Sequence, residues 1–257
     1  MTNSYVVTGG GRGVGRAIVE RLAERADAVV VVIEFDAAAV RWIDEHPARA
    51  RLRAVIGDAS DGCTAERAVD EAAAAGVLRG WVNNAAVFVD AWLHADPDAV
   101  TAAIGRNLSP AVVGSAAAAR HFLATDRPGA IVNVSSHQAQ RAVRGALAYA
   151  TAKAAIEGLT RALAVDYGPH GIRTNAVALG SIATERSAGH LAGLAPDARA
   201  DFEREIARAH PLGRMGSVAE VASAVAFLLS AEAAFVNGTV LAVDGGRAAL
   251  GRDPEEL

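Results

Sequence analysis

The chain has 257 residues, 52% hydrophobic and 21% charged, with a formal net charge of −4, so we expect a buried core rather than disorder. This mildly acidic balance, without a basic run, argues against nucleic acid and anionic membranes as partners. The single cysteine, Cys63, excludes an internal disulfide, and we expect neither a signal peptide nor a membrane span, which together predict a cytoplasmic protein.

Apolar runs of strand length alternate with alanine-rich helical stretches along nearly the whole chain. The runs are continuous, which is typical of strands buried on both faces of a parallel sheet. Strands are predicted at 5–8, 28–33, 52–57, 80–83, 129–135, 171–177 and 239–243. Helices are predicted near 14–25, 37–46, 64–75, 97–124, 149–166 and 218–230. This alternation predicts a doubly wound parallel α/β sheet, and because no linker or repeat interrupts it we expect a single domain over 1–257.

The stretch from about 185 to 210 breaks this rhythm. It is polar, helix-prone and rich in arginine, glutamate and histidine, and it follows directly after a predicted strand. Ligands of such sheets bind at the carboxyl ends of the strands. We therefore predict an insert that covers the substrate, with a solvated pair of surface helices as the alternative.

Gly9, Gly13 and Gly15 follow the first strand and open the first helix, in the segment Thr8-Gly-Gly-Gly-Arg-Gly-Val-Gly15. Glycine lets the backbone turn tightly and approach a pyrophosphate, which then meets the N–H groups at the helix N-terminus. The spacing is Gly-x-x-x-Gly-x-Gly rather than the more common Gly-x-Gly-x-x-Gly. We predict cofactor contacts from Gly9, Arg12, Gly13, Val14 and Gly15.

Acidic residues end the next two strands. Glu34 can accept hydrogen bonds from an adenosine ribose diol and would repel a 2′-phosphate, whereas Arg12 could pair with such a phosphate. Asp36 is expected to be the N-cap of the following helix. Asp58, followed by Ala59, could reach an adenine amino group or simply belong to a turn. We expect NAD rather than NADP, because the carboxylate at the buried strand end should dominate.

Tyr149 and Lys153 stand four residues apart, so on a helix they share one face. A phenol with its usual pKa near 10 is a poor base at neutral pH, but a neighbouring cation favours the phenolate and lowers that pKa. We therefore predict that Tyr149 transfers a proton to or from an alcohol or carbonyl. Ser136, thirteen residues upstream, is its expected partner.

Together these segments resemble the classical short-chain dehydrogenase/reductase family. The resemblance implies a Rossmann-type sheet of seven strands, a nicotinamide cofactor and usually a homotetramer. The matching pieces run in the family's order over nearly the whole chain: the glycine segment, Asn83-Asn-Ala-Ala86, Asn107, Ile131-Val-Asn-Val-Ser-Ser136, Tyr149-Ala-Thr-Ala-Lys153, Ile172-Arg-Thr-Asn-Ala-Val177 and Val243-Asp-Gly-Gly246.

The resemblance also implies roles. Tyr149 matches the acid/base tyrosine, and Lys153 matches the lysine that lowers its pKa and binds the nicotinamide ribose. Ser136 matches the serine that hydrogen-bonds the reacting oxygen. Asn107 matches the asparagine that completes the proton relay through a water, and Asn84 matches the segment that contacts the adenosine ribose.

Ile182 and Thr184 match the loop that holds the carboxamide of the cofactor. Two positions depart from the family pattern. Ala86 replaces the usual glycine, which should be tolerated close to the cofactor. Leu179-Gly180 replaces the usual Pro-Gly, which should loosen the loop that carries Ser181–Thr184.

These residues predict an oxidoreductase that transfers a hydride reversibly between a nicotinamide cofactor and a secondary alcohol or ketone. An NADP-dependent carbonyl or 3-oxoacyl reductase is the first alternative, supported by Arg12, and a non-catalytic nucleotide sensor or scaffold is the second. No metal site is predicted. The substrate is open: His137, Gln138 and Gln140 either border the pocket or shape a loop, and Trp92 and His94 are similarly ambiguous.

The helices predicted at 97–124 and 149–166 are unusually rich in alanine. Small residues permit close helix approach, so we predict that both helices pair with their symmetry mates around a two-fold axis. A second interface through the strand at 239–243 would give a tetramer. The alternative is that alanine only reflects helix propensity. The alanines concerned are Ala116–Ala119, Ala150, Ala152, Ala154 and Ala155.

Overall fold

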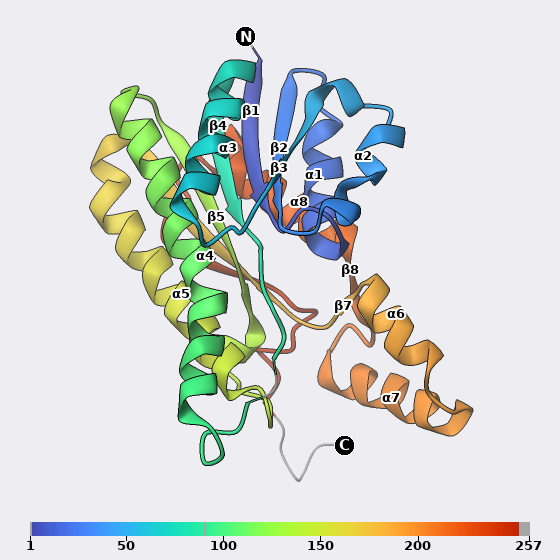
Figure 1. Ribbon diagram of the computed structural model, residues 1–257. Coiled ribbons are helices and arrows are strands. Elements are labelled where there is room, and N and C mark those ends of the chain that lie inside the picture. Colours follow the sequence, from blue (N-terminus) through green and yellow to red (C-terminus); the bar gives the residue numbers. More distant parts are fainter. Residues whose placement is uncertain (1, 90, 252–257) are drawn as a thin grey trace.

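The computed structural model describes residues 2–89 and 91–251. Seven parallel strands form one sheet in the order β3-β2-β1-β4-β5-β6-β9, with the crossover between β1 and β4 that defines a doubly wound fold (Figure 1). This confirms the predicted Rossmann-type sheet in a single domain. The strands are β1 (Asn3–Thr8), β2 (Ala28–Glu34), β3 (Leu52–Ile56), β4 (Val77–Asn83), β5 (Gly129–Ser136), β6 (Ile172–Leu179) and β9 (Val240–Val243).

Helices cover both faces of the sheet (Figure 1). One face packs against α1 (Gly13–Ala23) and α8 (Val218–Leu229), and the other against α3 (Gly62–Ala75), α4 (Pro97–Ala124) and α5 (Leu147–Tyr167). Alternate residues of a strand serve opposite faces. In β2, Val30 and Val32 belong to the first core and Val31 and Ile33 to the second, which explains the continuous apolar run.

A buried polar network fixes the end of β4 against α4. The Asn83 side chain donates to Asn133 Oδ1 at 2.8 Å and to Ser115 Oγ at 3.0 Å, and it accepts from Trp81 Nε1 at 2.8 Å. A Cβ atom at Gly114 would lie 2.2 Å from Asn83 Oδ1, so only glycine allows α4 to approach this closely. The network therefore sets the position of Asn84 and the residues that follow it.

The predicted helix at 37–46 is wrong in length and type. The structure has a 3₁₀ turn η1 (Ala37–Val40) and a single turn α2 (Trp42–Glu45). His46 leaves the helical region because it precedes Pro47, whose ring disfavours helical dihedrals at the residue before it. The other short 3₁₀ turns are η2 (Arg49–Arg51), η3 (His137–Ala139), η4 (Gly168–His170) and η5 (Ala231–Ala233).

The segment near 185–210 forms a helical pair, α6 (Glu185–Ala192) and α7 (Pro196–Ala209), that projects beyond the carboxyl end of the sheet (Figure 1). None of the described residues of either helix is buried. Two short strands that the sequence did not predict, β7 (Ile182–Ala183) and β8 (Gly216–Ser217), pair with each other in parallel and tie the two ends of this insert together.

The end of α7 is also fixed to the loop after β6. His210 is buried, accepts a hydrogen bond from the Ser181 N–H at 3.1 Å through Nε2 and lies 2.9 Å from the Ile206 carbonyl through Nδ1. Because the carbonyl can only accept, the ring carries its proton on Nδ1. Among the helices of the described residues, none has the length and apolar character required to cross a membrane.

Candidate active site

A cavity of about 1130 Å³ opens at the carboxyl edge of the sheet, where β1 and β4 diverge. It runs from the glycine-rich loop after β1 to the insert, and its volume exceeds the 300–1,000 Å³ or so that a single drug-sized ligand needs. It is therefore large enough to hold a dinucleotide together with a small second molecule.

The glycine loop forms one wall of this cavity. Gly9 and Gly13 have φ values of +64° and +52°, a region that favours glycine, and a Cβ atom at Gly15 would lie 2.0 Å from the Gly9 carbonyl oxygen. Arg12 is the N-cap of α1 and provides no side-chain cap. The first N–H groups of α1, beginning at Gly13 and Val14, are therefore available to an anion in the cavity.

Glu34 is buried at the end of β2 and lines the cavity. Its Oε2 accepts from the Gly11 N–H at 3.1 Å, and its Oε1 accepts from the N–H groups of Phe35 at 3.0 Å and Asp36 at 3.4 Å. A carboxylate offers about four lone-pair sites, so one remains for a ribose hydroxyl. The side chain is thus oriented by the glycine loop and places its charge at the predicted position.

Arg12 forms an ion pair with Asp36 at the mouth of the cavity. Asp36 also accepts from the Ala38 N–H at 2.9 Å, which confirms its predicted role as an N-cap. The cation that could favour a 2′-phosphate is therefore held by a carboxylate.

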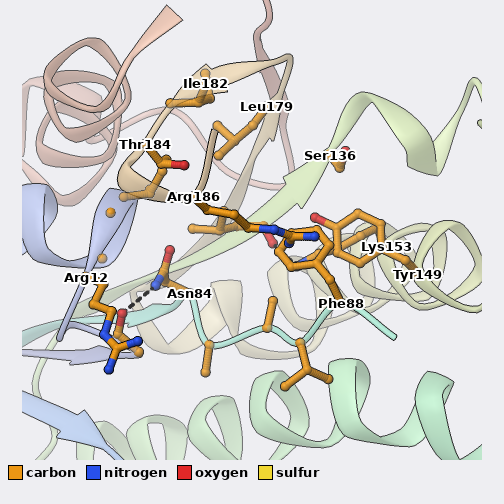
Figure 2. Close-up of a pocket in the computed structure, with 18 of the residues that line it drawn as sticks. Arg12, Asn84, Phe88, Ser136, Tyr149, Lys153, Leu179, Ile182, Thr184 and Arg186 are labelled. Carbon is orange, nitrogen blue, oxygen red and sulfur yellow. Dashed lines mark hydrogen bonds between the residues drawn. The ribbon is translucent and has the colours of Figure 1, made fainter. Parts of the chain in front are cut away.

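Asp58 and Ala59 line the cavity after β3. Asp58 Oδ1 accepts from both the N–H and the hydroxyl of Ser60, at 2.8 and 2.7 Å, so this oxygen stabilises the turn. Asn84 lines the cavity from the end of β4, and its amide donates to the Thr8 and Gly9 carbonyls, both at 3.0 Å (Figure 2). These donors hold the glycine loop in place.

Ile182 and Thr184 line the cavity at the entrance to the insert. Thr184 caps α6 in a reciprocal pair with Ser187, and its methyl group lies 3.5 Å from the position of a Cβ atom at Gly13. The expectation that Leu179 loosens this loop is not supported, because Gly180 donates to the Val243 carbonyl at 3.1 Å and Ile182 is paired in β7.

Helix α5 and strand β5 bring the three predicted catalytic side chains together at the other end of the cavity (Figure 2). Lys153 Nζ lies 5.4 Å from the centroid of the Tyr149 ring and donates to the Val134 carbonyl at 2.7 Å. Ser136 ends β5, and its hydroxyl interacts with the phenol of Tyr149.

The prediction of a lowered pKa for Tyr149 is wrong in this structure. Burial raises the pKa of the phenol to about 12, outweighing the opposing effects of the Ser136 hydroxyl and the charge of Arg186. Burial also lowers the pKa of Lys153 to about 8, which weakens the cation that was expected to stabilise the phenolate. Both shifts have one cause: the ends of the two side chains are withdrawn from water.

Asn107 does not line the cavity. It is buried in α4, where its Oδ1 accepts from the Val87 N–H at 3.0 Å and its Nδ2 donates to the Ala103 carbonyl at 3.0 Å. The side chain therefore anchors the segment after β4 to α4.

Residues that the sequence analysis did not select complete the reactive end of the cavity. The Phe88 ring stacks on Tyr149 with centroids 5.0 Å apart, and the Arg186 guanidinium carbon lies 3.9 Å from the Phe88 centroid (Figure 2). Arg247, after β9, donates to the Ser181 hydroxyl at 2.9 Å and also lines the cavity. The only sequence signal for Arg186 is its place at the start of the arginine-rich insert.

The other candidates divide between the cavity and its surroundings. His137 and Gln138 line the cavity; burial, followed by the charge of Arg247, lowers the pKa of His137 to about 4. Gln140 instead donates to Glu157 at 3.3 Å and lies outside the lining.

Trp92 and His94 pack against each other, 6.1 Å between ring centroids, and are also outside the cavity lining. No group of three or more potential metal ligands occurs in the part of the chain that the structure describes.

Comparison with known proteins identifies the family. A family profile described as enoyl-(acyl carrier protein) reductase matches residues 9–248. The chain belongs to the short-chain dehydrogenase/reductase family. An L-xylulose reductase from Bos taurus is 35% identical over 243 residues, which make up 94% of each chain.

Solved structures agree. The aldohexose dehydrogenase of Thermoplasma acidophilum superimposes with a TM-score of 0.84 and 31% identity over 100% of this chain and 97% of that one. A gluconate 5-dehydrogenase from Burkholderia cenocepacia J2315, in complex with NADP and tartrate, gives a TM-score of 0.82 and 32% identity over 97% and 96% of the two chains. The protein is therefore a nicotinamide-dependent oxidoreductase that acts on alcohols or ketones.

Lys153 gives a testable pH dependence for protein stability. Its folded-state pKa of about 8 lies below the ordinary 10.5, so between these values the unfolded chain binds a proton that the folded chain has lost. The resulting destabilisation is fully present below pH 8 and is relieved as the pH rises toward 10.5. We expect the free energy of unfolding, relative to a Lys153→Met variant, to increase by about 2 kcal/mol between pH 7.5 and about 9.5. Urea unfolding at both pH values measures this; a difference that does not change with pH would contradict the shifted pKa.

Proposed function

We propose that this enzyme catalyses the reversible, NAD-dependent oxidation of a secondary alcohol to a ketone, with Tyr149 as the acid/base residue. The observation that carries the proposal is that Ser136, Tyr149 and Lys153 meet in the same cavity as the glycine loop. A substrate oxygen between Ser136 and Tyr149 can therefore contact both the serine hydroxyl from β5 and the phenol from α5.

The residues of the cavity fit a dinucleotide. The uncapped N-terminus of α1 suits the pyrophosphate, and the remaining lone pair of Glu34 suits the adenosine ribose. Asp58, Ala59 and Asn84 border the adenosine side. We assign Ile182 and Thr184 to the carboxamide and Lys153 to the second ribose; all three line the cavity.

Oxidation requires Tyr149 as the phenolate, which takes the proton of the substrate hydroxyl; because burial raises the pKa of the phenol to about 12, alkaline pH favours this direction. A nicotinamide cofactor held by the glycine loop, Glu34 and Lys153 would supply the acceptor for the carbinol hydride. Ser136 donates a hydrogen bond to the substrate oxygen, whose charge changes during the reaction. Lys153, as an ammonium, would support the phenolate from one side. The side chain of Asn107 is bonded to Val87 and Ala103 outside the cavity lining, so we assign it a positioning part in the proton relay, through the segment after β4. In the reduction direction the same groups return the proton.

Replacing Tyr149 with phenylalanine tests the acid/base assignment. The phenylalanine keeps the stack with Phe88 but removes the hydroxyl, so we expect NAD binding and stability to be nearly unchanged and turnover to fall by about 10²–10⁴. Tyr167→Phe, at the end of the same helix and outside the cavity lining, is the matched control. Steady-state NADH production measures both variants. If Tyr149→Phe retained most of its activity, another group would be moving the proton.

The preference for NAD is supported by the charges at the end of β2. Glu34 and Asp36 place two carboxylates around Arg12, and Arg12 is already paired with Asp36. A 2′-phosphate would therefore meet net negative charge. NADP remains the competing cofactor, because the related gluconate 5-dehydrogenase binds NADP and Arg12 lies within the same wall. An NADP-dependent carbonyl or 3-oxoacyl reductase would follow from that choice.

Asp36→Asn should shift the cofactor preference toward NADP. Asparagine keeps the N-cap but removes the charge that holds Arg12. We expect the ratio of kcat/KM for NADP over NAD to rise about tenfold, equivalent to about 1.4 kcal/mol. Adding Arg12→Gln should abolish the gain. If the double variant kept it, Arg12 would not be the phosphate ligand, and if wild type already preferred NADP, the proposal would be wrong.

The insert is proposed to cover the substrate. Phe202 and Ile206 of α7 and Arg186 of α6 line the same cavity as Val143 and Tyr149. An insert that closed over this end would exclude water from the reacting groups.

A homotetramer is the proposed assembly, with a corrected argument. Most of the alanines selected from the sequence, such as Ala118 and Ala152, are buried within the chain, so they do not provide the interface. The support comes instead from Val165, which is 75% exposed on α5, and from Gly158, where a Cβ atom would meet nothing within 4 Å. Phe235, 104% exposed shortly before β9, supports the second interface.

Light scattering at micromolar concentration tests the assembly. We expect four times the 26.3 kDa mass of the chain. Val165→Arg should reduce that mass, because a charge would be buried at the α5 pairing, whereas Ile56→Arg on the edge strand β3 should leave it unchanged. A wild-type mass near a single chain contradicts the proposal, and a dimer would leave one of the two interfaces.

A cytoplasmic location is also proposed. The one cysteine of the chain, Cys63, is free and exposed, which suits a reducing compartment.

A further inference from the structure

The reactive end of the cavity carries positive charge that proton transfer does not use. Arg186 and Arg247 line this end from two separate elements, the start of the insert and the segment after β9. The carboxylates that line the cavity within the described residues stand elsewhere: Glu34 ends β2, Asp36 and Asp58 follow β2 and β3, and Glu185 is the first residue of α6.

Glu185 and Arg186 are adjacent but serve opposite sides of the cavity. A carboxylate oxygen of Glu185 lies 3.7 Å from the position of a Cβ atom at Gly13, beside the glycine loop. The guanidinium of Arg186 instead lies on Phe88, which stacks on Tyr149, and its charge reaches the phenol (Figure 2). The insert therefore presents a cation to the substrate side.

Arg247 is half-buried and fixed in position. Its guanidinium donates to the Ser181 hydroxyl at 2.9 Å. Its positive charge contributes to the lowered pKa of His137, the neighbour of Ser136. Asp244 partly balances this charge, but its carboxylate accepts from the N–H groups of Gly246 at 2.9 Å and Ala248 at 2.7 Å and lies outside the cavity lining. The remaining donors of Arg247 can serve an anion.

We propose that the substrate is a carboxylate-bearing secondary alcohol, a hydroxy acid or sugar acid, whose carboxylate binds Arg247 and is enclosed by Arg186. This inference rests on the proposed dehydrogenase function and names its substrate class. The planar guanidinium matches a carboxylate in a two-point hydrogen bond.

The present position of Arg186 is compatible with this role. An exposed cation–π contact such as that with Phe88 is weaker than a charge-assisted hydrogen bond to a carboxylate, so a bound acid draws the guanidinium from the ring. Arg186 would then leave Phe88 and turn toward the bound carboxylate.

Matched pairs of probes test the substrate class. D-Gluconate is compared with D-glucitol, and 3-hydroxybutyrate with 1,3-butanediol, because the members of each pair differ mainly in the carboxylate. We expect kcat/KM with NAD to favour the acid in at least one pair by tenfold or more. In Arg247→Gln, that acid should lose about 10- to 100-fold in kcat/KM, mainly through KM, with little change for the neutral alcohol. Arg199→Gln, an exposed arginine of α7 outside the cavity lining, is the control for loss of charge.

A binding measurement keeps the inference separate from the proposed function. Calorimetric titration of the protein–NAD complex with both acids should give a heat of binding that Arg247→Gln abolishes and Arg247→Lys partly restores. If the acids do not bind while neutral alcohols are oxidised, the inference fails and the dehydrogenase function stands. If the acids bind through Arg247 but no probe is oxidised with either cofactor, the anion site stands and the proposed function fails. An equal loss for acid and alcohol in Arg247→Gln would also overturn the inference.

Discussion

The site depends on how closely α1 approaches the carbonyl of Gly9. A side chain at Gly15 would lie 2.0 Å from that oxygen, and the same carbonyl accepts from the Asn84 amide. The turn after β1 and the end of β4 are therefore joined at one atom. Because Gly11 in the same turn also binds Glu34, displacement of α1 would disturb the acidic end of the cavity as well as the anion-binding end.

Two of the ionisable groups that line the cavity, Glu34 and Lys153, are buried, and they differ in their hydrogen-bond partners. The Glu34 carboxylate accepts hydrogen bonds from three N–H groups, whereas the ammonium of Lys153 donates to the Val134 carbonyl. Burial lowers the pKa of Lys153 to about 8 and raises the pKa of Tyr149 to about 12. Such groups reduce stability, and they persist at active sites because the surrounding fold holds them in place.

The sequence predicted the strands of the main sheet well and selected Ser136, Tyr149 and Lys153, which meet in one cavity, because both depend on local pattern. Continuous apolar runs mark strands that are covered on both faces, and a spacing of four places Tyr149 and Lys153 on one helix face. The sequence could not predict the direction of the phenol pKa, since that depends on burial by distant segments. For the same reason Arg186 and Arg247 were missed: they meet Tyr149 and His137 only in the folded chain. Pro47 is the sequence signal that indicates a shorter helix near 37–46.

The way in which the insert is attached affects how the family can change. Helices α6 and α7 contribute no buried residue to the core, and a ladder of two residues between β7 and β8 joins the base of the insert. The energetics of the insert are thus largely independent of the energetics of the sheet. Substitutions in α6 and α7 can accumulate without threatening the folding of the domain, which leaves specificity free to diverge while the hydride-transfer machinery stays fixed.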